Sequence, residues 1–221
     1  SDVTYTAIFK EAPHTIASET DWNNFAEAVS YGYDYNGEDV TQTADITVST
    51  MVGGADAAGV YDESIFFKGT FDGGCNTITF NKANATEQYT APFRRIDGAT
   101  IQNVKVTGTV SSSNRFAGCV VAYSKGTSTV TNCINSTSIT STGNTHGGIV
   151  GMVGSGGTLN ISGCVFNGTM SSGTDWSGIL GLCNSGCTAN ISNCLFIPAS
   201  VSVSSTSGTI FRSNGTVNPL S

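Results

Sequence analysis

Apolar residues in the second half of the chain recur at a period close to thirty. Each lies in a short run of β-branched residues bounded by Gly, Ser or Asn, a pattern typical of short strands. Three columns of this kind contain only apolar residues: Ile101, Val130, Ile161 and Ile191; Val110, Ile139, Met170 and Val201; Val120, Val150, Leu180 and Ile210. The pattern therefore predicts three short strands in each unit of about thirty residues.

Units of this size cannot bury both faces of their strands alone, so they must stack. Wound as a coil, each strand lies about 4.8 Å above its counterpart, and equivalent side chains superpose. We therefore expect an all-β fold, a right-handed parallel β-helix of four to five coils. Glycines and cysteines follow the same spacing, and we expect the glycines to lie at corners of the coil and the cysteines to be buried. These columns are Gly118, Gly148, Gly178 and Gly208, and Cys133, Cys164 and Cys194.

The segment 19–31 has a helical pattern instead. Ser18 and Asp21 resemble a capping box, and the apolar residues that follow recur at helical spacing. We expect an amphipathic helix that covers the first coil, because an open coil end exposes unpaired strand edges; an ordinary surface helix is the alternative. Residues 1–66 are predicted to form this cap with short strands and loops, and residues 67–221 the coils, within one structural domain.

Composition excludes several classes of partner. The net charge is -7 and the pI is about 4.6. Nucleic acid requires a basic face, so it is not an expected partner, and anionic membrane surfaces are disfavoured for the same reason. No apolar run approaches the roughly 18 residues of a membrane span, so this segment is not expected to insert into a membrane. Fifteen of the sixteen Asp and Glu residues lie at or before Asp97, and Asp175 alone follows.

The coils offer little catalytic chemistry. Glycoside hydrolysis needs two carboxylates, and a lyase of the pectate type needs an acidic calcium site with a basic residue nearby. The leader segment DYNGED, residues 34–39, is rich in oxygen atoms, but its glycine is misplaced for an EF-hand loop, so we prefer a solvated turn to a calcium site. We expect no catalytic residue, no metal and no cofactor. A polysaccharide lyase or glycoside hydrolase is a distant alternative.

One column contains large rings. Phe116, His146 and Trp176 follow the thirty-residue step, and Arg115 and Asp175 are beside them in the sequence. If the rings point outward, they form a vertical strip with a polar margin, which suits the faces and hydroxyl groups of sugars. These five residues are the predicted ligand-binding set. Packing of the rings into the core or a corner is the alternative.

The chain has seven cysteines, an odd number, so at least one thiol is free or bonds to another chain. Cys183 and Cys187 are the only close pair. The sequence leaves open whether they form a disulfide or occupy two unrelated columns.

Several motifs together carry a resemblance to a known family. FKGTFDGGCNTI is followed by APFRRIDGATIQNVKVTGTV and then by repeated G-G-I-V-G, N-C and N-G-T elements. This series resembles the GLUG-repeat proteins of bacterial surfaces, and DWNNFAEAV with TADITV is similar to the leader that often precedes such repeats. The resemblance covers residues 15–211; APFR replaces the usual G-L-F-G, and the last coil, SGTIFRSNG, is degenerate. It implies a secreted or surface-anchored, adhesin-like protein whose repeats are not catalytic.

These observations predict a non-catalytic adhesive module that binds a glycan or a host glycoprotein along one lateral face. The alternative is a structural spacer that holds flanking domains of a larger surface protein or stacks on another copy. The chain opens at Ser1 without Met or an apolar leader. We therefore expect any export signal or anchor to lie outside it.

Overall fold

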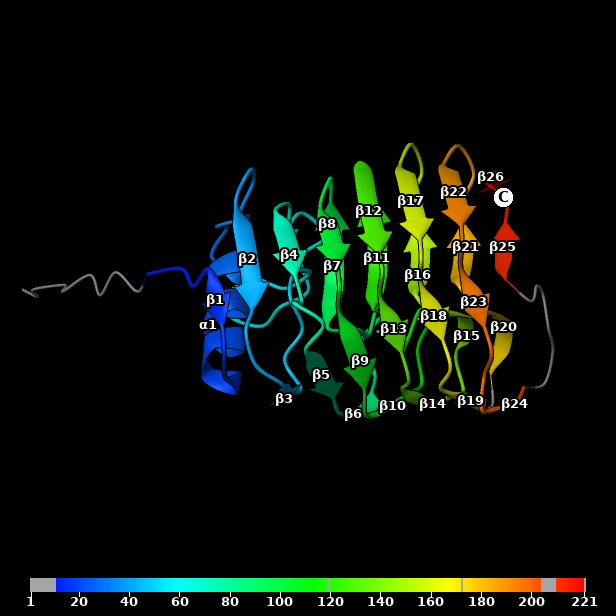
Figure 1. Ribbon diagram of the computed structural model, residues 1–221, viewed down its shortest axis with the longest axis horizontal. Helices are drawn as coiled ribbons and strands as arrows, with labels where there is room; N and C mark the ends of the chain where they lie inside the picture. The colour runs from blue at the N-terminus through cyan, green and yellow to red at the C-terminus, as the bar shows by residue number, and fades with distance from the viewer. Residues whose placement is uncertain (1–10, 119, 172, 204–209, 221) are drawn as a thin grey trace, which may run out of the picture.

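The chain is a right-handed parallel β-helix of about seven coils, with one α-helix at its N-terminal end (Figure 1). The computed structural model describes residues 11–118, 120–171, 173–203 and 210–220, of Leu220 only the backbone. The predicted fold class is confirmed. The expected number of four to five coils is too low, because the stacked strands begin well before residue 67.

Four long sheets run along the axis of the coils, and a short fifth sheet joins two of the later coils. The first sheet contains β1 (Thr15–Ile16), β2 (Asp39–Gln42), β4 (Thr70–Asp72), β8 (Thr100–Gln102), β12 (Thr127–Thr131), β17 (Thr158–Ser162), β22 (Thr188–Ser192) and β26 (Thr216–Leu220). The second contains β3 (Ile46–Val48), β5 (Thr77–Phe80), β9 (Lys105–Thr107), β13 (Ile134–Asn135), β18 (Val165–Phe166) and β23 (Leu195–Phe196).

The other three sheets complete the coil. The third contains β6 (Lys82–Ala85), β10 (Thr109–Ser112), β14 (Ser138–Ser141), β19 (Thr169–Ser171) and β24 (Ser200–Ser202). The fourth contains β7 (Phe93–Asp97), β11 (Val121–Lys125), β16 (Val150–Val153), β21 (Leu180–Cys183) and β25 (Phe211–Ser213). The fifth pairs β15 (Asn144–Gly147) with β20 (Thr174–Ser177). A full coil therefore has at least four strands rather than three, since the two- and three-residue strands of the second sheet were not expected.

The register confirms two of the predicted apolar columns. In the first sheet Val130 pairs with Ile101 on one side and with Ile161 on the other. In the third sheet Ile139 pairs with Val110 and with Met170. Each position therefore lies directly above its counterpart, and the inward residues form one continuous core along the coil.

The third predicted column is shifted by one residue at both of its ends. Val150 pairs with Val121 rather than with Val120, because this coil is one residue shorter than thirty. Leu180 pairs with Phe211 rather than with Ile210, because the last coil is one residue longer. A strict thirty-residue step does not detect such changes in coil length.

The repeated N-C elements lie at the turn from the first sheet to the second. Asn103, Asn132 and Asn193 have φ angles of 54°, 53° and 51°. Asparagine adopts this left-handed conformation more readily than most residues do. The residue that follows points into the core, and Val104 and Cys133 are fully buried there. The buried Cys164 follows Gly163 instead, which has the same left-handed conformation with a φ angle of 62°. A left-handed corner is therefore followed by an inward side chain in each of these coils.

Helix α1 (Glu19–Ser30) closes the N-terminal end of the core (Figure 1). The Ser18 side chain accepts a hydrogen bond from the Asp21 N–H at 3.1 Å, which satisfies one free donor of the first turn. The buried Trp22 ring packs edge-on against Phe71 and Phe93, and its Nε1–H donates to the Thr50 carbonyl at 2.9 Å. The helix is therefore a plug for the coil, as predicted, rather than an ordinary surface helix.

The sheets continue across the expected division between residues 66 and 67. Val40 in β2 pairs with Phe71 in β4, and Ile46 in β3 pairs with Ile78 in β5. Residues 39–48 therefore already form part of a coil. Most of the buried apolar residues described make one cluster from Ile16 to Ile191, and a smaller separate cluster contains Tyr89, Ala91, Phe116, Ala122 and Leu182.

Candidate functional site

The three rings of the predicted aromatic strip are buried. Phe116, His146 and Trp176 expose only 1%, 3% and 7% of their surface. The Trp176 ring packs against Phe196, 5.5 Å away between ring centroids. The Phe116 ring stacks on Tyr89 at 5.1 Å. The prediction of a strip that faces solvent is therefore wrong, and the rings stabilise the corner and the core instead.

The five predicted ligand-binding residues also do not share one surface. His146 and Trp176 pair directly in the fifth sheet. Phe116 is one position out of register with them, because Val121, five residues after Phe116, pairs with Val150, five residues after Thr145. Phe116, Thr145 and Asp175 have φ angles of 59°, 61° and 58°, so they form one left-handed corner in successive coils.

The two polar residues of that set have structural partners. The guanidinium of the exposed Arg115 lies 5.1 Å from the centre of the Phe116 ring. The Asp175 carboxylate lies 3.4 Å from Arg212. Arg212 also donates to the Thr145 hydroxyl at 3.0 Å, so this ion pair braces the corner.

The glycine columns lie in adjoining coils. The Asn135 amide donates to the carbonyls of Gly118 and Gly148 at 2.8 and 2.5 Å. Gly118 has a φ angle of 84°, which a residue with a side chain rarely adopts. Gly148 is needed for a different reason, because a Cβ atom there would collide with the Gly178 carbonyl. Gly208 lies outside the described residues.

The cysteine column is structural as well. Cys133 and Cys164 are buried, and Cys194 in the last coil is partly exposed. Hydrogen bonding with Cys133 raises the pKa of the Cys164 thiol. This thiol is therefore protonated and unreactive at neutral pH. Cys183 and Cys187, which the sequence left open, form a disulfide.

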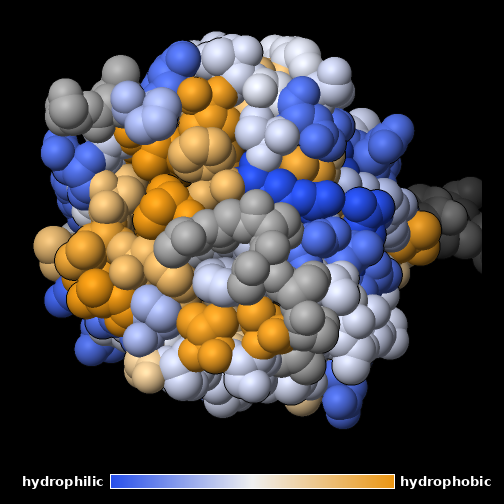
Figure 2. All heavy atoms as spheres, turned by 90° about the vertical axis from the view of Figure 1, so that its right-hand side faces the viewer, coloured by the Kyte–Doolittle hydropathy of each residue, from blue (hydrophilic) through white to orange (hydrophobic). Residues whose placement is uncertain are grey.

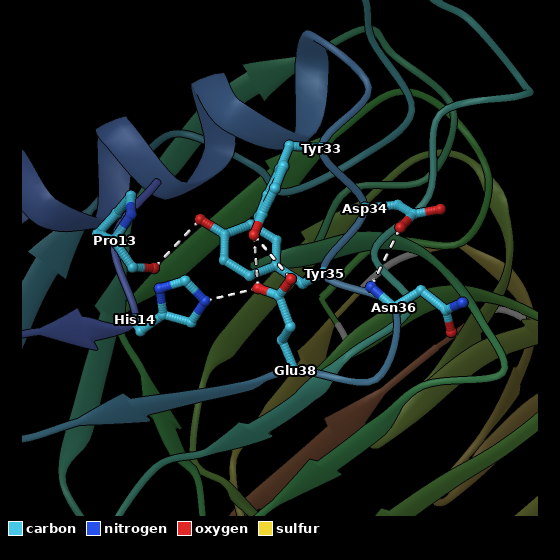
Figure 3. Close-up of polar contacts among 7 residues, drawn as sticks. All are labelled: Pro13, His14, Tyr33, Asp34, Tyr35, Asn36 and Glu38. Atoms are coloured by element: carbon cyan, nitrogen blue, oxygen red, sulfur yellow. Dashed lines mark hydrogen bonds and ion pairs between the residues drawn. The ribbon is translucent and has the colours of Figure 1, made fainter. Parts of the chain in front are cut away.

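A cluster at the N-terminal end combines exposed rings with a carboxylate, and we call its members His14, Tyr33, Tyr35 and Glu38 the tyrosine–carboxylate cluster (Figure 3). The Tyr33 hydroxyl donates to the Glu38 carboxylate and lies 2.7 Å from each of its oxygens. The Nε2 atom of His14 lies 2.6 Å from Glu38 Oε2. Tyr33 is 42% exposed, and Tyr31, two positions earlier in the sequence, is 73% exposed.

The chain builds this cluster directly after α1. A turn at residues 31–37 brings Glu38 up to the start of β2, and the Asp34 carboxylate fixes the turn by accepting from the Asn36 N–H at 3.1 Å. Asp34 also forms an ion pair with Lys68 at 2.8 Å. The Tyr35 ring is buried and contacts Phe25 at 5.1 Å, so the base of the cluster is part of the core.

Tyr35 supports the exposed ring above it. The Tyr33 ring meets the Tyr35 ring edge-on, with 4.8 Å between their centroids. The Tyr35 hydroxyl donates to the Pro13 carbonyl at 3.1 Å, next to His14 (Figure 3). The exposed Tyr33 ring is therefore held at its edge by a buried ring and at its tip by a carboxylate.

Hydrogen bonding sets the charge of the cluster. The bond from Tyr33, and then the bond from His14, hold the pKa of the Glu38 carboxyl below its usual value. The same contact raises the pKa of the Tyr33 hydroxyl. The cluster therefore offers an ionised carboxylate and a neutral phenol across the whole neutral range of pH.

Metal binding finds no support here or elsewhere in the described part of the chain. No group of three or more His, Cys, Asp or Glu side chains within it could hold a metal ion. In the DYNGED segment, Lys68 pairs with Asp34, and His14 pairs with Glu38. Two of the carboxylates that suggested calcium, Asp34 and Glu38, are thus engaged by side chains of the protein itself.

A second polar group on the lateral wall proves to be structural. Arg95 is buried, and its guanidinium lies 4.2 Å from the centre of the Tyr123 ring and 4.7 Å from that of Phe66. Its Nη1 donates to the Tyr61 hydroxyl at 2.5 Å. Because Tyr61 and Phe66 belong to the segment 53–66, Arg95 fastens that loop to the fourth sheet.

Sequence reasoning missed the tyrosine–carboxylate cluster. The signal was present in YGYDYNGE, residues 31–38, where three tyrosines alternate with other residues and Glu38 follows the last tyrosine by three positions. Only the oxygen atoms of this segment were considered, and the rings were not. His14 could not have been assigned, because it reaches Glu38 across 24 positions of sequence.

Comparison with known proteins adds no identity: no family model matches the chain, and no curated protein or solved structure matches it either. No helix within the described ranges is long and apolar enough to cross a membrane.

Proposed function

We propose that the chain is a non-catalytic adhesive module that binds carbohydrate through the tyrosine–carboxylate cluster. The observation that carries this proposal is the exposed Tyr33 ring, held against the Glu38 carboxylate by a 2.7 Å hydrogen bond. Sugars bind to proteins by stacking their C–H faces on aromatic rings, while their hydroxyl groups bond to polar side chains at the margin. The cluster offers both elements within one contact.

Rigidity of the site favours binding. The Tyr33 ring is fixed between Tyr35 and Glu38, so little side-chain freedom is lost when a ligand stacks on it. Glu38 stays ionised and accepts hydrogen bonds from sugar hydroxyls, and these charge-assisted bonds are stronger than neutral ones. Tyr31, close by in the sequence, adds a second exposed ring.

The coils act as the support of this site. Along the outer face of the first sheet, the Asn190 amide donates to Asn160 at 2.8 Å, and the Asn218 amide donates to Asn190 at 2.9 Å. These amides bond to one another from coil to coil, so they stiffen the solenoid. Within the same proposal the chain is a GLUG-type repeat of a secreted or surface-anchored protein, which a host glycoprotein would meet at this end.

A glycan array tests the proposal. The parent should bind a defined set of sugars, and Tyr33→Ala should lose most of that signal, because the stacking ring is removed. Val60→Ala, which shortens a 62% exposed apolar side chain on the loop 53–66, serves as the control and should bind as the parent does. A parent that binds no glycan, or a Tyr33→Ala variant that binds as well as the parent, contradicts the proposal.

The proposal that the chain is not catalytic has its own test. Incubation with a panel of polysaccharides, with and without calcium, should release no reducing ends and no unsaturated products. Release of either in proportion to added protein would reassign the chain to the lyases or hydrolases.

A structural spacer is the second candidate, and one observation favours it. Leu195 and Ile197, which flank the inward Phe196, are 49% and 53% exposed, and Figure 2 shows apolar side chains gathered on this side of the molecule, as on a surface that meets another protein. A parent protein that is folded and stable but binds no glycan on the array would support the spacer over the adhesive module.

A further inference from the structure

Two adjacent arginines of β7 lie on the same side of the fourth sheet. Neighbouring side chains of a strand normally point to opposite faces. Here the N–H groups of Arg94 and Arg95 both donate to the Val52 carbonyl, at 2.9 and 3.3 Å. Two consecutive donors on one acceptor mark a β-bulge, which redirects side chains. The residues on either side, Phe93 and Ile96, are both buried in the core, so the bulge turns both arginines outward.

The loop 53–66 covers both side chains. A Cβ atom on Gly54 would lie 2.9 Å from Arg95 Cδ and 3.0 Å from Arg94 Cδ. The Arg94 guanidinium lies 4.9 Å from the centre of the Tyr61 ring. Arg94 and Arg95 therefore expose only 6% and 5% of their surface.

The later coils do not repeat this arginine pair. The positions that continue the column of Arg95 are Tyr123, Met152 and Leu182. Arg94 is the last residue of APFR, the element that replaces the G-L-F-G of the repeats this chain resembles. Stacking of the coils thus needs no positive charge here, and the pair is an addition to the repeat.

Aromatic rings surround the Arg95 guanidinium. Four ring centres lie between 4.2 and 5.8 Å from its central carbon: those of Tyr61, Phe66, Tyr89 and Tyr123. The face of an aromatic ring attracts a cation. It carries no net charge, however, so the positive charge of the guanidinium is not neutralised.

Neither arginine forms an ion pair with a carboxylate within the described ranges. Two carboxylates on neighbouring segments are engaged elsewhere: Glu87 pairs with Lys82 at 3.0 Å, and Asp62 accepts from the Ser64 N–H at 2.8 Å. Burial of a charge is costly unless an opposite charge compensates it. Two buried positive charges side by side therefore favour an anion from outside the chain.

Free donors remain on both arginines. The loop is fastened through Nη1 of Arg95 alone, and the Nε atom of this residue is buried without a partner. Arg94 directs Nε and Nη2 to a single acceptor, the Gln88 carbonyl, at 3.3 and 3.1 Å. The Tyr61 hydroxyl accepts from Arg95, so its own proton is available to a ligand.

We propose that Arg94 and Arg95 bind a small oxyanion, a carboxylate, sulfate or phosphate group, on the outer face of the fourth sheet. The planar fork of a guanidinium matches two oxygen atoms of such a group. The anion enters where the two arginines keep their small exposed area, beside the loop 53–66. The proposal does not rest on carbohydrate binding at the tyrosine–carboxylate cluster, and a silent glycan array would leave it standing.

NMR of the arginine side chains tests the site in the unmodified protein. The Nε–H resonances of Arg94 and Arg95 are followed while inorganic phosphate, sulfate or acetate replaces chloride at constant ionic strength. At least one of the three anions should shift both resonances to saturation, and the anion that does so identifies the class of ligand. The net charge of -7 disfavours nonspecific anion binding. No shift with any of the three, or a drift that never saturates, overturns the proposal.

Calorimetry on variants tests the contribution of the arginines with the anion that responds. Arg94→Gln leaves the bond between Arg95 and Tyr61 in place and should weaken binding by about tenfold or more, because a charged donor is lost. Lys105→Gln removes the same charge from an exposed position on β9 and should bind as the parent does. A folded Arg94→Gln protein that binds as tightly as the parent, or an equal loss in Lys105→Gln, overturns the assignment of the site.

Discussion

The backbone N–H of Ala117 donates a hydrogen bond to Nδ1 of His146, 3.1 Å away in the next coil. Burial lowers the pKa of this imidazole, an effect that a contact with the Gly143 carbonyl offsets in part. The ring is therefore neutral and joins two coils through its acceptor nitrogen. Protonation of Nδ1 would remove the acceptor and place a charge where the side chain is 3% exposed.

This arrangement predicts that acid weakens the coil. Below the unfolded pKa of about 6.5 the unfolded chain binds a proton that the folded chain does not, so the free energy of unfolding falls as the pH falls toward the lower, folded pKa. Above about pH 6.5 this contribution is fully present. Urea titrations across the range measure it, and His146→Gln should reduce the slope.

The exposed Thr20 supplies the control for that experiment. Thr20→Ala should keep the pH dependence of the parent, because it removes no titratable group. If His146→Gln and the parent lose stability equally on acidification, His146 is not the group responsible.

Asn135 is expected to be among the most sensitive polar residues of the core. It is fully buried and bonds to the carbonyls of Gly118 and Gly148, while its Oδ1 accepts from the Thr137 N–H at 3.0 Å. Asn135→Ala leaves these groups unpaired in the interior, which should cost about 2–3 kcal/mol of unfolding free energy. Asn167→Ala, at an exposed asparagine one coil further on, should cost less than about 0.5 kcal/mol. Equal losses would refute the bridging role.

The cap formed by α1 is predicted to stabilise the whole solenoid. Trp22→Ala removes a buried ring between Phe71 and Phe93 and should cost about 3–5 kcal/mol. Thr20→Ala on the exposed side of the same helix should change stability by less than about 0.5 kcal/mol. Hydrogen exchange would report the loss first in β2 and β4, next to the plug. A Trp22→Ala protein as stable as the parent would mean that α1 is not a structural cap.

The sequence predicts the coil well, because stacked strands require apolar residues at a regular spacing along the chain. The Ile101 and Val110 columns and the helix with Ser18 at its start agree with the structure. The prediction of an aromatic strip failed because the rings pack inward: His146 and Trp176 are in register and are nevertheless buried. Phe116 is also displaced to the position of Thr145, since its coil is one residue short. Spacing alone reveals neither the direction of a ring at a corner nor a change in coil length.

The candidate site was harder to foresee than the fold. Tyr33 and Glu38 are close in sequence, but His14 and the supporting ring of Phe25 come from other elements. The first coil was also missed, because the segment 49–66 interrupts the period between β3 and β4. Long insertions hide a repeat even where its strands keep their register.

The electrostatics of the cluster can be checked without a ligand. The Tyr33 bond contributes most to the lowered pKa of Glu38, and the His14 bond comes second. Tyr33→Phe should therefore raise the pKa of Glu38 toward its ordinary value, and by more than His14→Gln does. Carboxyl shifts followed by NMR during an acid titration measure both values. An unchanged pKa in Tyr33→Phe would show that the hydrogen bond does not hold in solution.

The most direct test of carbohydrate binding maps the contact on the protein. Amide resonances are followed by NMR while the glycan with the strongest array signal is added to the parent. The account predicts that the largest shifts fall on residues 31–38 and on His14, and that the coil residues 100–200 barely move. Shifts concentrated on the coils, or none at all at saturating glycan, would contradict it.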